Sequence, residues 1–134
     1  KRLIGAVPLY YLRRKTAGWG SAAGIFDPRA FAEYARCFAD PATIHATCED
    51  YRAAASIDLV HDDADVAAGR KVACPLLVLW GEKGVVNRYF SPVEDWRTVA
   101  EDAGGRALPG GHYLAEEVPE ETLRELVAFF AAGQ

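Results

Sequence analysis

Residues 75–81 read Pro-Leu-Leu-Val-Leu-Trp-Gly, an unbroken apolar run that a glycine closes. A short continuous run of this kind is typical of a parallel strand that is buried on both faces of its sheet. Ser91-Pro92 predicts a helix that continues to about Glu101, because proline is favoured in the first helical turn. Residues 105–109 form a second, weaker strand candidate. The order strand, helix, strand predicts an α/β fold.

The second predicted strand leads into Gly110-Gly111-His112-Tyr113-Leu114, and Val118-Pro119 starts a final helix after it. A glycine hinge lets the backbone turn sharply and leaves an imidazole exposed at the end of a strand. His112 could there accept a proton from a nucleophile or a water near neutral pH. The alternative is a surface or helix-capping histidine. No Gly-x-nucleophile-x-Gly elbow precedes it, so a catalytic His112 would need a nucleophile from outside this chain.

Residues 1–69 have a helical spacing of apolar side chains. Two helix starts are Asp-Pro pairs, Asp27-Pro28 and Asp40-Pro41, in which aspartate caps the helix and proline occupies its first turn. The second pair is predicted to open a helix that reaches about Leu59. A short acidic helix is expected over residues 61–68.

The composition limits the classes of function. The chain has 134 residues, is 51% hydrophobic and carries a net charge of −4 without a basic stripe, so neither disorder nor a nucleic-acid partner is expected. No apolar run approaches the roughly 20 residues of a membrane span, which argues against a membrane partner. Three cysteines without paired spacing indicate reduced, buried thiols in a cytoplasmic protein. We expect no metal and no cofactor.

Two parallel strands do not make a stable sheet, and an apolar strand with a bare edge invites aggregation. We therefore expect the chain to be the C-terminal part of a larger α/β enzyme. Residues 1–69 would be a partial helical cap, and residues 70–134 the end of the core.

The order strand, Gly81, helix, strand, Gly111-His112, helix resembles the end of an α/β-hydrolase. Within that fold the chain is similar to the haloacetate (fluoroacetate) dehalogenases over nearly its whole length. The motifs that carry this resemblance are Cys48-Glu49-Asp50-Tyr51-Arg52-Ala53, Leu79-Trp80-Gly81, Gly111-His112-Tyr113-Leu114-Ala115-Glu116-Glu117 and Pro119-Glu120. The resemblance implies a C-terminal portion of an α/β-hydrolase fold with a helical cap.

The resemblance also implies a two-step mechanism, in which an aspartate on the missing elbow displaces halide and a histidine-activated water hydrolyses the ester. His112 matches the water-activating base. Tyr51 matches a halide-stabilising hydroxyl, although it could instead pack on its helix. Lys15 and Trp19 match a pair at the pocket entrance of some relatives, where lysine attracts the carboxylate and tryptophan narrows the passage. Their alternative is a solvated lysine beside a packed tryptophan.

One departure concerns the acid that orients the histidine. Many α/β-hydrolases carry it after this strand as Gly-x-x-Asp, whereas this chain has Gly81-Glu82-Lys83-Gly84. Glu82 is a possible substitute acid, but we expect it to be exposed, since it follows the strand end by one residue. The haloacetate dehalogenases instead take the acid from a strand before the cap, which is absent here. Four later glutamates are interpreted as favourable charges at the last helix's N-terminus: Glu116, Glu117, Glu120 and Glu121.

The implied partners are a small halogenated carboxylate and the N-terminal part of the hydrolase core. A homodimer stays open, since relatives are commonly dimers. An epoxide hydrolase is the enzymatic alternative, with Tyr10, Tyr11 or Tyr34 as a candidate second cap tyrosine. A catalytically inactive α/β-hydrolase-like binding module is the non-enzymatic alternative.

Overall fold

The computed structural model describes residues 1–20, 22 and 24–132 of the chain. They form two compact units, one of Lys1–Thr16 with Asp27–Arg70 and the other of Ala17–Phe26 with Lys71–Gln134. The helical unit contains Lys15 and Tyr51, and the strand-containing unit contains Trp19 and His112.

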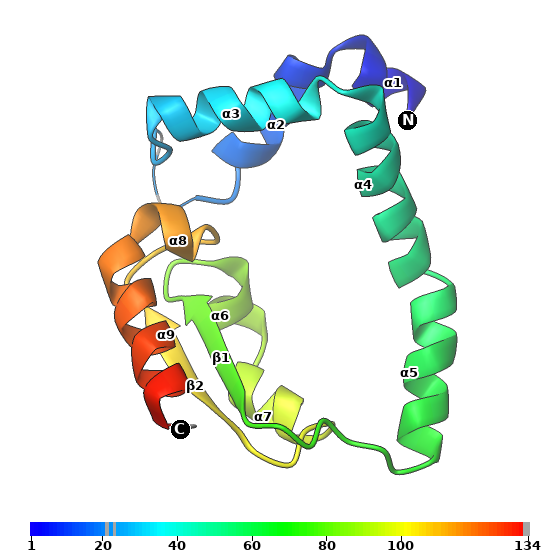
Figure 1. Cartoon of the computed structure of the whole chain (residues 1–134), viewed down its shortest axis with the longest axis vertical. Coiled ribbons are helices and arrows are strands. Elements are labelled where there is room, and N and C mark those ends of the chain that lie inside the picture. Colours follow the sequence, from blue (N-terminus) through cyan, green and yellow to red (C-terminus); the bar gives the residue numbers. More distant parts are fainter. Residues whose placement is uncertain (21, 23, 133–134) are drawn as a thin grey trace. The chain divides into compact units, whose positions relative to one another are not determined.

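The first unit is helical, and its two predicted helix caps are confirmed. The Asp27 carboxylate accepts the N–H groups of Arg29 at 2.8 Å and Ala30 at 3.3 Å, and Asp40 accepts that of Ala42 at 2.8 Å. These bonds satisfy donors that a helix N-terminus leaves without a partner. The five helices (Figure 1) are α1 (Arg2–Ala6), α2 (Pro8–Ala17), α3 (Pro28–Phe38), α4 (Pro41–Ala54) and α5 (Ile57–Ala67).

The helix predicted to reach Leu59 ends earlier, at Ala54, and α5 begins at Ile57. The cause lies in the last turn, where the Ala55 N–H donates to the Arg52 carbonyl at 3.2 Å. The Ser56 hydroxyl also donates to that carbonyl, at 2.6 Å. A serine bonded back to the preceding turn competes with continuation of the helix.

The second unit contains two parallel strands, β1 (Leu76–Gly81) and β2 (Ala103–Leu108), with Val78 opposite Gly105. The parallel pairing is as predicted. A Cβ atom at position 105 would lie 1.8 Å from the Val78 carbonyl oxygen. The glycine that weakened the strand signal is therefore what lets the strands approach.

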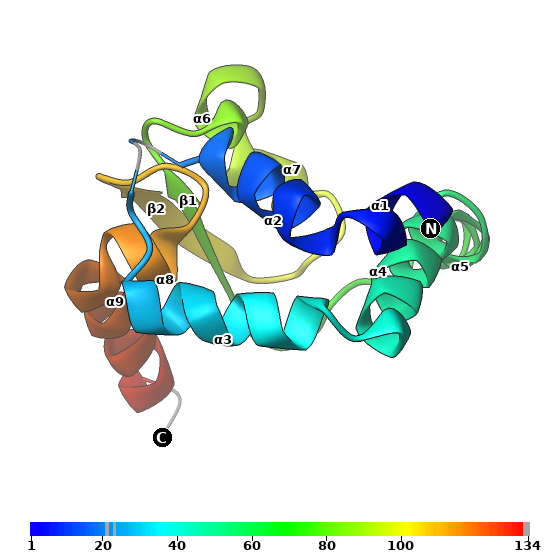
Figure 2. The same ribbon diagram turned by 90° about the horizontal axis from the view of Figure 1, so that it is seen from above.

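Four helices surround these strands: α6 (Val85–Tyr89), α7 (Pro92–Arg97), α8 (Leu114–Glu117) and α9 (Pro119–Ala132). Figures 1 and 2 both show the strands between α6 and α7 on one side and α9 on the other. The helix predicted to reach Glu101 stops at Arg97, because the Val99 carbonyl accepts the Val72 N–H at 2.9 Å and the chain turns toward the sheet. The sequence did not predict α6.

An exposed ion pair ties α9 to β2. Arg106 Nε donates to Glu125 Oε1 at 3.0 Å, and this bond lowers the pKa of Glu125 below its ordinary value. The pair therefore adds stability above that ordinary value and loses it as the pH falls through the lowered pKa. Because the Arg106 guanidinium is exposed and Glu125 is half-buried, the contribution is modest and partly screened by salt.

The core of the described residues is small. Its buried apolar residues are Ile44, Val78, Ala100, Ala103 and Leu108. The expectation of buried cysteines is wrong, since Cys37 and Cys74 are exposed and Cys48 is half-buried. Cys37 lies on the solvent side of α3, and Cys74 precedes β1. In the part of the chain that the structure describes, no helix combines the length and apolarity that a membrane crossing needs.

Candidate active site

The loop that carries His112 crosses the end of β1 at very close range. A Cβ atom at Gly81 would lie 1.8 Å from the Gly111 carbonyl oxygen and 2.6 Å from that of Gly110. The Lys83 N–H donates to the Gly110 carbonyl at 3.0 Å and holds the two loops together. A side chain at position 81 would displace the histidine loop.

The predicted glycine hinge has a different physical basis. Positive φ angles occur at Gly24, Gly69 and Gly105 among the described residues, and not at Gly110 or Gly111. The close approach therefore requires glycine at position 81 of β1, rather than a left-handed conformation in the histidine loop.

The His112 imidazole is exposed at the point where the chain leaves the carboxyl end of β2. Its ring centroid lies 5.1 Å from that of Trp19 and 5.2 Å from that of Tyr113. The His112 N–H donates to the Trp19 carbonyl oxygen at 3.1 Å, so the segment that contains Trp19 also holds the loop. The Trp19 and Tyr113 rings therefore contact the imidazole, which remains exposed to solvent.

A cavity of about 230 Å³ lies beside His112 at the carboxyl ends of the strands. Its walls are largely apolar, with Leu79, Trp96 and Leu114 among them. The Trp80 indole N–H donates to the Asn87 side chain at 2.8 Å and fixes one of these walls. Small-molecule sites in α/β folds lie at the carboxyl ends of the strands, so this cavity is the candidate site.

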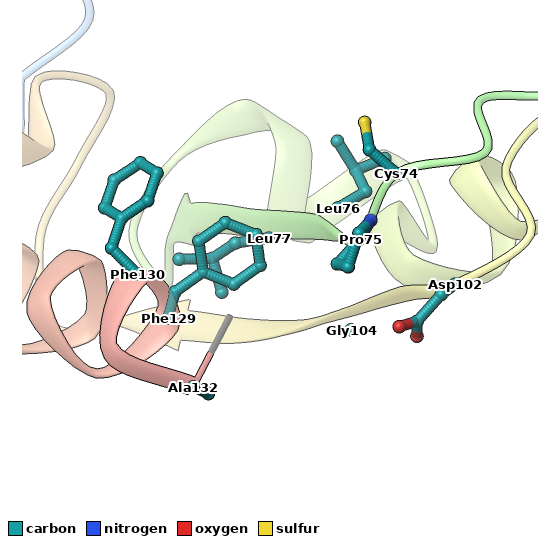
Figure 3. Close-up of a pocket in the computed structure, with 9 residues that line it drawn as sticks. All are labelled: Cys74, Pro75, Leu76, Leu77, Asp102, Gly104, Phe129, Phe130 and Ala132. Carbon is teal, nitrogen blue, oxygen red and sulfur yellow. The ribbon is translucent and has the colours of Figure 1, made fainter. Parts of the chain in front are cut away.

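A larger cavity of about 680 Å³ lies at the opposite, amino ends of the strands. Figure 3 shows the Phe129 ring of α9 against Leu77 of β1, while Leu76 lies nearer to Cys74 and Pro75. Asp102 is the single charged residue in the lining. The cavity is therefore an apolar recess of the sheet, without the converging polar groups of a reaction site.

Lys15 and Tyr51 meet within the helical unit. The Lys15 ammonium lies 5.8 Å from the centroid of the Tyr51 ring, and Tyr51 is 62% exposed. A cation at this distance is attracted by the π face of the ring. Because Tyr51 is exposed, its ring is not part of the packed core. Its position opposite His112 stays a prediction.

No carboxylate among the described residues hydrogen-bonds the His112 ring. Glu82, the residue next to Gly81, is exposed.

Sequence reasoning missed the role of Glu117. It was interpreted as a favourable charge near the last helix, but its carboxylate accepts the Gly111 N–H at 2.9 Å and the Tyr113 N–H at 3.1 Å. The sequence shows only that Glu117 follows Tyr113 by four residues. A glutamate near a helix start is too common to predict this contact.

No protein-family model matches the chain. The fluoroacetate dehalogenase of Burkholderia sp. is 36% identical over 132 residues, which are 98% of this chain and 43% of that protein. The soluble epoxide hydrolase of Corynebacterium sp. (strain C12) is 29% identical over 126 residues, 90% of this chain and 41% of that enzyme.

Solved structures agree with the fold. A protein from Nostoc sp. PCC 7120, classed as an alpha/beta hydrolase, has a TM-score of 0.91 at 53% identity, over 96% of this chain and 44% of its own. The chain spans less than half the length of these relatives. Its parallel strands, histidine loop and similarities make it a member of the α/β-hydrolase superfamily, with the elements of the C-terminal portion of that fold.

Proposed function

We propose that this chain supplies the histidine and part of the cap of a hydrolytic haloacetate dehalogenase. The observation that carries the proposal is the exposed His112 ring beside a largely apolar cavity at the carboxyl ends of the strands. The 36% identity to a fluoroacetate dehalogenase supports the substrate class. An aspartate nucleophile and the orienting acid would come from a preceding half of the core.

The reaction proceeds in two steps. An oxygen of the aspartate attacks the carbon that bears the halogen, the carbon–halogen bond breaks with its electron pair on the halide, and an ester forms. His112 then takes a proton from a water whose oxygen attacks the ester carbonyl. The acyl–oxygen bond breaks, and the imidazolium proton passes to the departing glycolate oxygen. The second proton of the water leaves the aspartic acid for solvent, which restores the carboxylate.

Tyr51 and Lys15 stabilise negative charge on the leaving halide and on the substrate carboxylate. The Tyr51 hydroxyl donates a hydrogen bond to the departing halide, which is the difficult step when the halide is fluoride. Lys15, beside the Tyr51 ring, attracts the substrate carboxylate. Trp19, which contacts the His112 ring, narrows the approach to it.

The decisive test is His112→Asn in the full-length protein. We expect halide release from fluoroacetate to stop after one turnover, with a covalent ester visible by mass spectrometry, because ester formation does not need the base and ester hydrolysis does. His61→Asn is the matched control, since His61 is exposed on α5. A folded His112→Asn protein that forms halide without a trapped ester contradicts the role.

An epoxide hydrolase is the second candidate, favoured by the 29% identity to a soluble epoxide hydrolase. That chemistry uses the same aspartate and histidine but needs cap tyrosines that protonate the epoxide oxygen. Tyr10, at 66% exposed, and Tyr34, at 41%, lie on helices of the first unit. Turnover of an epoxide but not of fluoroacetate by the full-length protein would select this alternative.

A further inference from the structure

The backbone on both sides of His112 is held by one side chain. Glu117 Oε2 accepts the Gly111 N–H at 2.9 Å, and Glu117 Oε1 accepts the Tyr113 N–H at 3.1 Å. Each carboxylate oxygen therefore takes one amide, and the two amides flank the histidine. Hydrogen bonds to a charged acceptor are stronger than neutral ones.

The main chain of Glu117 also bonds to the histidine loop, at Tyr113. Its N–H donates to the Tyr113 carbonyl at 2.9 Å, so Glu117 engages both polar backbone groups of Tyr113. The remaining N–H of the loop, that of His112, donates to the Trp19 carbonyl. Three consecutive amides are thus satisfied, two of them by one carboxylate.

Loss of the carboxylate would leave a buried donor without a partner. Gly111 is buried, and its carbonyl oxygen already lies against Gly81. A buried N–H without an acceptor is unfavourable, so the loop would shift to find one. Such a shift moves the imidazole, which follows Gly111 directly.

We propose that Glu117 is a positioning residue, which fixes the His112 imidazole for the step in which it takes a proton from water, by accepting the N–H groups of Gly111 and Tyr113. The proposal rests on the function proposed for His112. Glu117 does not touch the reactant, so its effect falls on the step that uses the base. It is separate from any favourable charge interaction with α9.

The test compares Glu117→Ala and Glu117→Gln in the full-length protein by rapid-quench kinetics with fluoroacetate or chloroacetate. We expect ester formation and KM to stay near wild type. Ester hydrolysis should slow about 10- to 100-fold in Glu117→Ala, because small misplacements of a reacting group lower rates by such factors. Glu117→Gln should lie between, since its single amide oxygen can accept one of the two N–H groups.

Glu120→Gln is the matched control, because Glu120 is an exposed carboxylate in the first turn of α9. It should leave both steps unchanged. Wild-type ester hydrolysis in folded Glu117→Ala overturns the proposal, as does an equal loss in ester formation and hydrolysis. If Glu117→Ala does not fold, the Glu117→Gln protein decides by the same criterion.

Amide hydrogen exchange separates this proposal from the proposed function. We expect faster exchange at Gly111 and Tyr113 in Glu117→Ala and at one of these two amides in Glu117→Gln, whatever the substrate, and unchanged exchange in Glu120→Gln. If the wild-type protein forms no ester with either haloacetate, the proposed function fails. Unchanged exchange at both amides would overturn the clamp in that case too.

Discussion

The His112 side chain is exposed, while the N–H groups of residues 111–113 all have acceptors within the fold. Its own N–H donates to Trp19, and Glu117 accepts the N–H groups on either side. Among residues 1–20, 22 and 24–132, no side chain hydrogen-bonds the imidazole nitrogens, which face solvent. A histidine in a loop with such restraints can exchange a proton without the loop refolding, which is what a water-activating base requires.

Tyr51 provides the residue-scale prediction. Tyr51→Phe keeps the ring beside Lys15 and removes the hydroxyl. We expect ester formation from fluoroacetate to slow about 10²-fold, as for loss of one donor to a developing anion, with a smaller loss for chloroacetate. Fluoride and chloride electrodes measure both rates.

Tyr89→Phe is the control for that change, since Tyr89 is a 66% exposed tyrosine at the end of α6. Equal losses for the two halides in Tyr51→Phe would assign Tyr51 to packing or carboxylate binding. An unchanged rate would remove it from the site.

At the scale of elements, the end of β1 and the histidine loop are one unit of packing. Gly81 faces the Gly110 and Gly111 carbonyls at distances that exclude any side chain. The strand must therefore end in glycine for the loop to pass. This contact links the fold of β1 to the position of the catalytic candidate.

Gly81→Ala tests that link. We expect a loss of about 1–3 kcal/mol in the free energy of unfolding, because an extra methyl group in a packed site forces backbone shifts. Ester hydrolysis should fall as well. Denaturant unfolding and quench kinetics of the full-length protein measure the two effects.

Gly104→Ala is the matched control, since a Cβ at that β2 position meets nothing within 4 Å. It should change stability by a few tenths of a kcal/mol at most, as at other open surface positions. A Gly81→Ala protein as stable as Gly104→Ala would mean that the loop can move away without loss.

At the scale of the whole molecule, much apolar surface has no partner among the described residues. In α9, Leu123 is 61%, Val127 59% and Phe130 66% exposed. The amino ends of the strands border an apolar recess of about 680 Å³ (Figure 3). Surfaces of this kind are normally covered, which agrees with the proposed preceding half of the core.

The corresponding prediction is that the 134-residue chain alone releases no fluoride from fluoroacetate, because the proposal places the nucleophile outside it. The full-length protein, assayed at equal concentration with a fluoride electrode, is the positive control. Fluoride release by the purified chain alone would contradict the prediction and require a nucleophile among its own residues.

Local signals predicted much of the architecture. The Asp-Pro pairs located the starts of α3 and α4, the apolar run located β1, and Pro119 began α9. Each signal acts within a few residues, through a cap, a fixed φ angle or a run of apolar side chains. The same kind of pattern placed His112 at the end of β2.

The two parallel strands, the helix caps at Asp27 and Asp40, and the exposed histidine loop were thus determined by the sequence alone. The tertiary structure decided where α4 and α7 end, that β2 begins at Ala103, and that Glu117 clamps the histidine loop. It also brought Lys15 to Tyr51 and Trp19 to His112. The physical reason is that these features depend on contacts between atoms that only the folded chain brings together.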